Sequence, residues 1–250
     1  MKGMGGRLLI GTSGWTYASW RGTFYPEKLP SREYLEFYAG AFPTTEINYS
    51  FYHLPKPQTY ANWAARVPED FLFAVKASRF ITHIKRLLDV EEAWRLFIDN
   101  ALVLQNHLGP ILLQFPPSLK QDTGRLQDFL TIAQHHAGSR GKLRLVFEFR
   151  HESWFTSEVY RLLSRHGAAL CIADSHRYPR KDVLTTDWAY VRFHGRNQLF
   201  ASNYSRAELQ KEARILKRYL KDGMDVLVYF NNDAKGYAVK NAKTLGRLLE

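Results

Sequence analysis

The stretch Val146-Phe147-Glu148-Phe149-Arg150 is an apolar run with two charged residues at its end, and its pattern decides the fold. An apolar run bounded by polar residues is typical of a buried strand. Roughly eight such runs follow one another, which is the number of strands in a (β/α)8 barrel. The other runs are residues 8–12, 45–48, 72–76, 111–114, 171–174, 190–194 and 228–233. Because a buried charge costs free energy unless it is paired, these polar ends are expected to converge on one site.

Amphipathic helical patterns alternate with the runs. They predict helices over residues 31–42, 59–67, 90–108, 125–136, 157–166, 205–222 and 237–249. Ser31 is the expected N-cap of the first helix, and Gly167 the expected C-cap of the fifth. The short polar segment 175–182 breaks the alternation and predicts a loop or an irregular helix. The pattern predicts parallel strands with right-handed crossovers, closed into one TIM-barrel-like (β/α)8 domain of the α/β class over residues 1–250.

The amino-acid composition limits the classes of function that the chain can have. The chain is 45% hydrophobic, which is typical of a globular protein, and its net charge is +11. That charge favours a polyanionic partner, although many basic proteins have none. The single cysteine, Cys171, lies in an apolar run and excludes an intrachain disulfide. The start of the chain lacks the apolar region of a signal peptide, and no apolar run approaches about 18 residues, so we expect a cytoplasmic protein without a membrane partner.

Polar residues two apart in a strand point to the same face. Three runs carry such pairs: Glu46 and Asn48, Glu148 and Arg150, and Arg192 and His194. In a barrel this face is the interior at the carboxyl ends of the strands, because apolar helices cover the other face. Two interpretations follow. The pairs form a catalytic site, or they form a layer of buried salt bridges that plugs the barrel.

The candidate catalytic residues are Glu46, Lys76, Glu148 and His194. The two glutamates could serve as acid and base, and a neighbouring arginine would keep a glutamate ionised, which suits a base. Lys76 could form a Schiff base or bind an anion. His194 could shuttle a proton or bind a metal. Guanidinium groups at Arg150 and Arg192 suit phosphate or carboxylate.

A wider set of polar and aromatic residues is predicted to bind the substrate. It comprises Trp15, Tyr17, Asn48, His83, Gln114, Arg150, Asp174, Arg192, Asn231, Asn232 and Asp233. Trp15 and Tyr17 belong to an aromatic loop that either stacks on a sugar or base or forms a cap that seals the barrel.

A divalent metal is a further alternative. The residues of suitable ligand type are Glu46, Glu148, Asp174, His194 and Asp233. No short motif fixes a coordination geometry, and nearby cations would compete with a metal. The sequence therefore assigns no cofactor.

Several motifs carry a family resemblance. Gly11-Thr12-Ser13-Gly14-Trp15 resembles the opening motif of the domain of unknown function 72 (YecE-like) family. The resemblance continues, in order, through segments 46–48, 51–52, 76–77, 81–83, 108–110, 114–117, 148–151, 153–154, 192–195, 229–233 and 241–242. It covers nearly the whole chain and implies a TIM-barrel-like fold. It implies no activity, because the family is defined by its unknown function.

Two functions remain open from the sequence. One is an enzyme, a hydrolase or a lyase or isomerase, that acts on a small anionic substrate derived from a nucleotide or a sugar. The other is a non-catalytic protein that binds nucleic acid or nucleotides. On the predicted helix 205–222, Lys211, Arg214, Arg218 and Lys221 lie opposite the apolar stripe, on a face that is either solvated or binds nucleic acid. Charge reversal there would separate the two functions. The oligomeric state is not set by the sequence.

Overall fold

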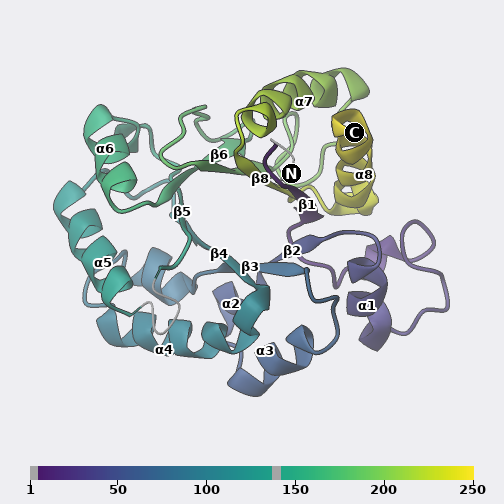
Figure 1. Ribbon diagram of the computed structural model, residues 1–250, viewed down its shortest axis with the longest axis horizontal. Helices are drawn as coiled ribbons and strands as arrows, with labels where there is room; N and C mark the ends of the chain where they lie inside the picture. The colour runs from purple at the N-terminus through teal and green to yellow at the C-terminus, as the bar shows by residue number, and fades with distance from the viewer. Residues whose placement is uncertain (1–4, 137–141) are drawn as a thin grey trace.

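The computed structural model describes residues 5–136 and 142–250, which form a nearly closed barrel of parallel strands with helices outside it (Figure 1). The hydrogen-bonded order is β1-β8-β7-β6-β5-β4-β3-β2, and every ladder is parallel. The strands are β1 (Leu8–Thr12), β2 (Thr44–Ile47), β3 (Leu72–Lys76), β4 (Leu108–Gln114), β5 (Leu145–Glu148), β6 (Ala169–Asp174), β7 (Trp188–Phe193) and β8 (Asp225–Phe230). The predicted TIM-barrel-like fold is confirmed.

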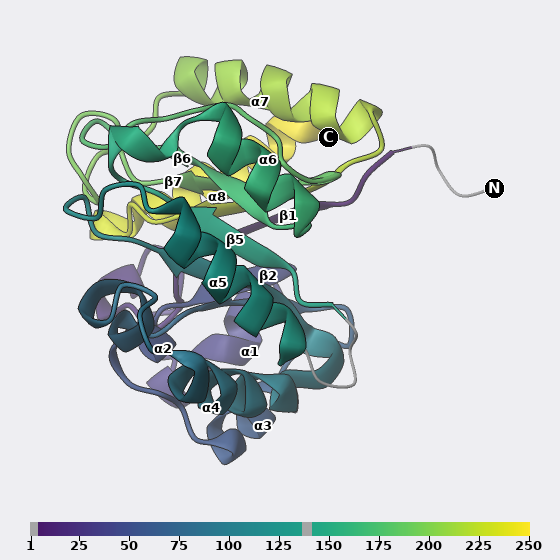
Figure 2. The same ribbon diagram turned by 90° about the vertical axis from the view of Figure 1, so that its left-hand side faces the viewer.

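Helices cover the outside of the strands, as Figure 2 shows for the side formed by α5 and α6. They are α1 (Tyr34–Ala39), α2 (Tyr49–Tyr52), α3 (Pro57–Ala64), α4 (Glu91–Ala101), α5 (Thr123–His135), α6 (Ser157–Arg165), α7 (Arg206–Lys221) and α8 (Tyr237–Leu249). Residues 175–187, all described, join β6 to β7 without a helix, which confirms the predicted loop. No helix in the described part of the chain is long and apolar enough to cross a membrane.

Short single-turn helices complete the connections. They are the 3-10 helices η1 (Ala18–Trp20), η2 (Ser31–Glu33), η4 (Leu102–His107), η6 (Glu152–Trp154) and η7 (Ala234–Gly236), and the π-helix η3 (Phe80–Ile84). Ser31 lies inside η2, and no side chain caps α1, so the predicted N-cap was wrong. Gly167 has a φ of +60° directly after the C-cap of α6, which confirms the predicted stop signal.

The helix predicted over residues 90–108 is shorter in the structure than the apolar pattern in the sequence indicated. It ends at Ala101, and η4 follows, with Gln105 at a φ of 49° and a ψ of −123°. The chain then enters β4 at Leu108, earlier than predicted. A Cβ on Gly109 would lie 3.0 Å from the Phe73 carbonyl oxygen, so β4 approaches β3 closely there. The apolar residues after Ala101 therefore pack in a 3-10 turn that leads into a strand, instead of extending the helix.

The barrel has two apolar layers. The outer layer packs the strands against the helices and contains three fully buried tryptophans, Trp20, Trp94 and Trp154. The inner layer fills the barrel and includes Cys171, which is free and buried. Its members are Leu9, Ala74, Leu112, Val146, Ala169, Cys171, Ala173, Trp188, Tyr190, Leu227 and Tyr229. Since side chains alternate along a strand, these residues fix which later positions also face inward.

The seam between β1 and β2 is closed by a side chain from α1. The Tyr38 hydroxyl accepts a hydrogen bond from the Thr12 amide at 2.8 Å and donates one to the Thr44 carbonyl at 3.1 Å. A Cβ on Gly11 would lie 2.0 Å from the Thr44 carbonyl oxygen, so only glycine permits this approach. Thr45 adds a hydrogen bond from its hydroxyl to the Thr12 carbonyl at 3.0 Å. Side-chain hydroxyls thus replace part of a backbone ladder at the seam.

Removing this hydroxyl tests the seam. We expect Tyr38→Phe to lower the free energy of unfolding by about 1–3 kcal/mol, because the buried Thr12 amide loses its acceptor. The matched control is Tyr60→Phe, since Tyr60 is fully buried and its hydroxyl has no hydrogen-bond partner in the described chain. Urea unfolding curves measure both variants. Equal losses in the two would show that the hydroxyl does not hold the seam.

Candidate active site at the carboxyl ends of the strands

The deepest polar layer of the barrel is built around Arg192. Its Nη2 lies 2.7 Å from Glu46 Oε1, and its Nη1 donates to Glu148 Oε2. The Ser13 hydroxyl also donates to Glu46, and the Tyr190 hydroxyl donates to Glu46 Oε2 at 2.7 Å. Arg192 and Glu46 are fully buried, and Glu148 nearly so. One guanidinium on β7 therefore joins carboxylates on β2 and β5 across the barrel, as the predicted plug of salt bridges requires.

Both carboxylates of this layer are ionised at neutral pH. Burial alone would raise the pKa of Glu46, but the charge of Arg192 and the hydrogen bond from Ser13 overcome it and lower that pKa. Burial acts in the same way on Glu148, where the charges of Arg192 and Arg150 hold the pKa well below its usual value. Neither glutamate carries a proton that it could donate near pH 7.

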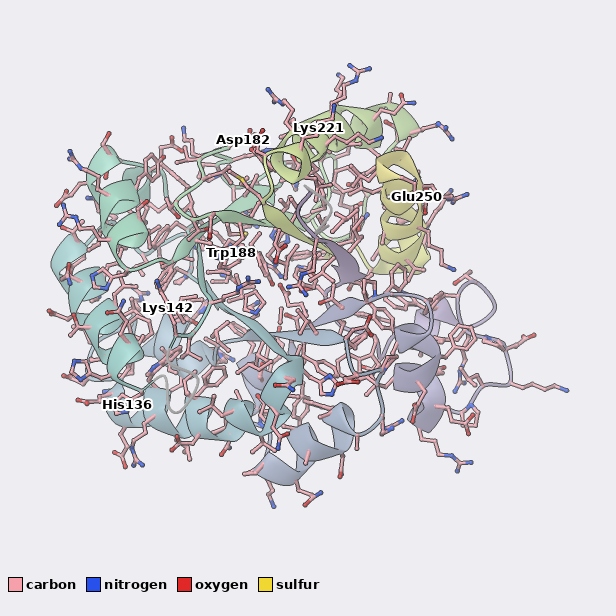
Figure 3. The ribbon with its side chains drawn as sticks, in the orientation of Figure 1. His136, Lys142, Asp182, Trp188, Lys221 and Glu250 are labelled. Carbon is pink, nitrogen blue, oxygen red and sulfur yellow. The ribbon has the colours of Figure 1, made fainter. Side chains whose placement is uncertain are left out.

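Two cations lie next to this layer and are partly exposed. Arg150, two residues beyond Glu148, donates from Nε to Glu148 Oε1 at 2.9 Å, and its guanidinium lies 4.4 Å from the centroid of the Tyr178 ring. Lys76 ends β3 on the inward face, and its Nζ lies 4.1 Å from the centroid of the Phe51 ring. Figure 3 shows nitrogen and oxygen atoms of many side chains gathered within the ring of strands.

The charge of Lys76 is finely balanced. Burial lowers the pKa of Lys76 to about 7, and the guanidinium groups of Arg192 and Arg150 act in the same direction. The carboxylates of Glu46 and Glu148 oppose them. At neutral pH the side chain is thus shared between its amine and its ammonium forms, which suits proton transfer.

His194 and Asn231 extend the inward face of β7 and β8. Burial lowers the pKa of His194 to about 4, so its ring is neutral at pH 7. Asn231 Nδ2 lies 3.1 Å from His194 Nδ1, and His194 Nε2 lies 3.4 Å from Glu148 Oε2. His194 Nε2 also lies 3.3 Å from Arg192 Nη1, so the neutral ring is held between an amide, a guanidinium and a carboxylate.

Gln114 and His83 form the side of the site next to β4. Gln114 pairs with Glu148 in register and faces inward. Its Nε2 donates to the Phe115 carbonyl at 2.7 Å and lies 3.4 Å from His83 Nε2. Burial lowers the pKa of His83 to about 4, and the charges of Lys76 and Arg150 act in the same direction. His83 therefore belongs to the same electrostatic neighbourhood as the two cations.

Tyr17 and Asp233 lie on the opposite side, after β1 and β8. The Tyr17 hydroxyl donates to the Ser13 carbonyl at 2.5 Å, and Trp20 Nε1 donates to the Asp233 carbonyl at 3.2 Å. Burial raises the pKa of Asp233 to about 6 and also raises the pKa of Tyr17, where the charge of Asp233 adds to the effect. Asp233 is thus a second group that can exchange a proton near neutral pH.

A cavity of about 290 Å³ adjoins the site between α1, α3 and the segments after β1 and β2. Asn48 and Tyr17 line it, and the Asn48 amide donates to the Ser13 hydroxyl at 3.0 Å. The other aromatic lining residues are Trp15, Tyr49 and Trp63, of which Trp15 and Trp63 meet edge to face at 5.5 Å. Of the aromatic loop after β1, Trp15 and Tyr17 line this cavity, and Trp15 is largely buried.

The rest of that loop forms the alternative, a sealing cap. Trp20 and Tyr25 are buried, with ring centroids 6.0 Å apart, and Tyr25 stacks on Tyr34 of α1 at 3.8 Å. Phe24 packs against the same rings. This part of the loop therefore forms a packed cap.

The structure does not bring Asp174 or Asn232 to the site. Ala173 and Tyr229 face the interior, so the residues at odd spacing from them, Asp174 and Asn232, face outward. Asn232 Nδ2 donates to Asn241 Oδ1 on α8 at 2.8 Å. Both residues are buried and polar, yet they join the strands to outer elements instead of lining the barrel interior.

Asp174 belongs to a second network of charges outside the barrel. Arg180 and Arg196 each contact Asp174 at 3.0 Å and also pair with Glu212 on α7. The Tyr204 hydroxyl donates to Asp174 Oδ2 at 2.8 Å. The two arginines neutralise the two carboxylates, so this network fastens the segments after β6 and β7 to α7.

Sequence reasoning missed three residues of the site. Ser13 and Tyr190 both contact Glu46, and Tyr178 stacks on Arg150. Tyr190 lies two residues before Arg192, so the alternation used for the polar pairs would have found it. Tyr178 lies in the loop after β6, where the sequence holds no signal of its direction.

The carboxylates of this site do not suit a metal. Within residues 5–136 and 142–250, no group of three or more His, Cys, Asp or Glu side chains is arranged to hold a metal ion. Glu46 and Glu148 use their oxygen atoms on Arg192, Arg150 and hydroxyl groups, and a metal would have to displace these partners.

Replacing the central arginine tests the deep layer. We expect Arg192→Met to lower the free energy of unfolding at pH 7 by about 3–5 kcal/mol, because both buried carboxylates lose a charged partner and Glu46 keeps only the hydroxyl groups of Ser13 and Tyr190 as hydrogen-bond donors. In the native protein the lowered pKa values of Glu46 and Glu148 favour folding at neutral pH, and this contribution is lost as the pH falls through them. In the variant, burial raises the pKa of Glu46, so the stability of the variant should increase as the pH falls from about 7 to about 5.

Urea unfolding at several pH values checks this prediction. The control is Arg161→Met on the outer face of α6, which should change stability by less than about 0.5 kcal/mol and keep the native pH dependence. If the Arg192 variant kept the native pH dependence of stability, the ionisation of the two carboxylates would not depend on Arg192.

Comparisons with known proteins place the chain in a family. A family model described as "Protein of unknown function DUF72" matches residues 9–250. The UPF0759 protein YunF of Bacillus subtilis is 26% identical over 97% of this chain and 95% of its own length. A crystal structure of a DUF72 family protein from Thermotoga maritima is 29% identical, with a TM-score of 0.80 over 97% of this chain and 99% of that one. A second DUF72 structure, from Enterococcus faecalis, has a TM-score of 0.81 at 21% identity over 97% and 95% of the two chains, a likeness of fold. The chain belongs to the DUF72 family of proteins of unknown function.

Proposed function

We propose that this protein is an enzyme that transfers protons on a small anionic substrate at the carboxyl ends of the strands. The observation that carries the proposal is the position of Lys76 and Arg150. These partly exposed cations lie beside a fully buried layer in which Arg192 pairs with both Glu46 and Glu148. A TIM barrel binds its substrate at this end of the strands in essentially every characterised enzyme of the fold.

The two cations are the groups that would hold the anionic part of the substrate. Arg150 keeps one edge on Glu148 and the face of its guanidinium on Tyr178, which fixes its orientation. Arg192 is fully buried and donates to Glu46, Glu148 and Ser13, so its role is to position the carboxylates. We therefore assign anion binding, which the sequence analysis expected of Arg192 as well, to Lys76 and Arg150.

Proton transfer is assigned to the groups that titrate near neutral pH. Lys76, with a pKa of about 7, can donate as an ammonium and accept as an amine. Asp233, with a pKa of about 6, is the second candidate, on the other side of the site. Glu46 and Glu148 are ionised and held by arginines, and their charges stabilise the ammonium form of Lys76.

The adjoining cavity supports a substrate with a ring. Its aromatic lining suits a sugar or a base, and it begins at Asn48 and Tyr17, which also border the site. Asn48 Oδ1 and Asp233 Oδ1 are buried oxygen atoms without a hydrogen-bond partner in the described chain, and each could accept from a substrate hydroxyl or amide. Substrates that carry a phosphate or carboxylate on a sugar or nucleoside fit both features.

The experiment is a screen for proton exchange. Purified protein is incubated in D2O with sugar phosphates, nucleotides and sugar acids, and proton NMR follows loss of carbon-bound hydrogen or formation of a product. We expect at least one compound to exchange or react, and Lys76→Met to abolish the effect. A complete absence of exchange and of product across these classes would count against the proposal.

The pH dependence of binding tests the role of Lys76. Because Lys76 loses its charge around its pKa of about 7, affinity for the anionic compound should fall as the pH rises from about 6 to about 8. Lys76→Arg should bind equally well at both ends of this range, since arginine stays charged. Arg161→Met on α6 is the matched control and should retain the native profile. Calorimetric titration measures all three proteins.

A further inference from the structure

Three grooves lie in succession on the outside of the barrel, over η7, α8 and the junction of α8 with α7. The first, of about 390 Å³, is lined by Lys235, Lys240, Lys243 and Arg247 among other residues. The second, of about 170 Å³, shares Arg247 with the first and adds Arg206 of α7. The third, of about 220 Å³, shares Leu248 with the second and is lined by Arg214 and Lys217. The shared residues show that the three grooves are neighbours on the surface.

The charge on this surface is of one sign. We call the seven cations that line the grooves the basic tract: Lys235, Lys240, Lys243, Arg247, Arg206, Arg214 and Lys217. No aspartate or glutamate lines any of the three grooves. All seven side chains are exposed, and none forms a salt bridge to a residue of the described chain. Arg180 and Arg196 nearby are, by contrast, fully paired with carboxylates.

We propose that the basic tract binds the phosphate backbone of a nucleic acid without regard to base sequence. Its cations extend over about 10 Å along α8, from Lys240 to Arg247, and about 16 Å along α7, from Arg206 to Lys217, at the rise of an α-helix. A nucleic-acid strand carries a phosphate about every 3.4 Å of helix axis, so the length on α8 faces about three phosphates and the length on α7 about five, or about four on average. A small anion would use one groove, whereas a repeating anion uses all three.

The same surface is poorly suited to a membrane. A helix that binds at the bilayer surface inserts large apolar side chains beside its cations. The exposed large apolar residues in the described chain are Phe37, Tyr49, Tyr52, Phe80, Ile84, Leu88, Leu96 and Phe200, and none belongs to α7 or α8. Further along α7, Lys211, Arg218 and Lys221 are exposed as well, and Figure 3 shows nitrogen-tipped side chains pointing outward from this helix. The outer side of α7 and α8 thus presents charge with no apolar anchor.

Fluorescence anisotropy with a labelled single-stranded DNA of about 20 nucleotides tests the proposal. For about four phosphate contacts, affinity should fall about 50-fold between about 50 and about 200 mM salt, and an oligonucleotide of scrambled sequence should bind equally well. The variant R214E/K217E/R247E should bind at least tenfold more weakly. The variant R214Q/K217Q/R247Q removes three positive charges without adding negative ones, so it should also bind the DNA more weakly, but by a smaller factor.

The matched control is R161E/R165E/K56E, which reverses two arginines and one lysine that are exposed on α6 and before α3. We expect a loss of less than threefold. An equal loss in both triple variants would overturn the proposal, because general attraction by the net charge would then explain binding. Affinity that does not depend on salt would also overturn it, as would displacement of the DNA by vesicles that contain phosphatidylserine but not by unlabelled DNA.

Discussion

The ion pairs of Arg192 with Glu46 and Glu148 are the constraint on which the carboxyl end of the barrel depends. A guanidinium with no solvent exposure cannot be deprotonated, so it persists only where its charge is met at short range. The two carboxylates that meet it come from strands on different sides of the barrel. The pairing therefore fixes the spacing of β2, β5 and β7, and it allows polar groups to occupy an interior that is apolar at its other end.

The same pairing sets the protonation states around it. The positive charge of Arg192 keeps both carboxylates ionised and, together with Arg150, lowers the pKa of Lys76. The two glutamates, which are the usual candidates for acid–base chemistry by residue type, therefore do not titrate near pH 7. Lys76 and Asp233, at the edges of the cluster, do. The salt-bridge plug predicted from the sequence is present, and Lys76 and Asp233, the groups that titrate near neutral pH, lie at its edges.

The eight apolar runs predicted the barrel, and the alternation of side chains along a strand predicted most of the cluster. It worked where a run carried a polar pair two residues apart, as at Glu148 and Arg150. It failed for Asp174, because the run Cys171-Ile172-Ala173-Asp174 has small residues on the inner face and no polar partner to mark that face. The closure of the seam by Tyr38 was beyond such reasoning, because it depends on how closely β1 and β2 approach one another in space.

The net charge of +11 does not arise from the site. Within the barrel, Arg150 and Arg192 face Glu46 and Glu148, so the local charges cancel apart from Lys76. Seven cations without a salt bridge in the described chain lie instead on α7, η7 and α8, where no carboxylate lines the three grooves. The excess of basic residues in the composition therefore describes the outer surface of the protein and does not indicate the charge of a substrate. Lys76 and Arg150 are screened less by salt than the cations of the outer surface, because a charge that is partly buried interacts through a medium of lower dielectric constant.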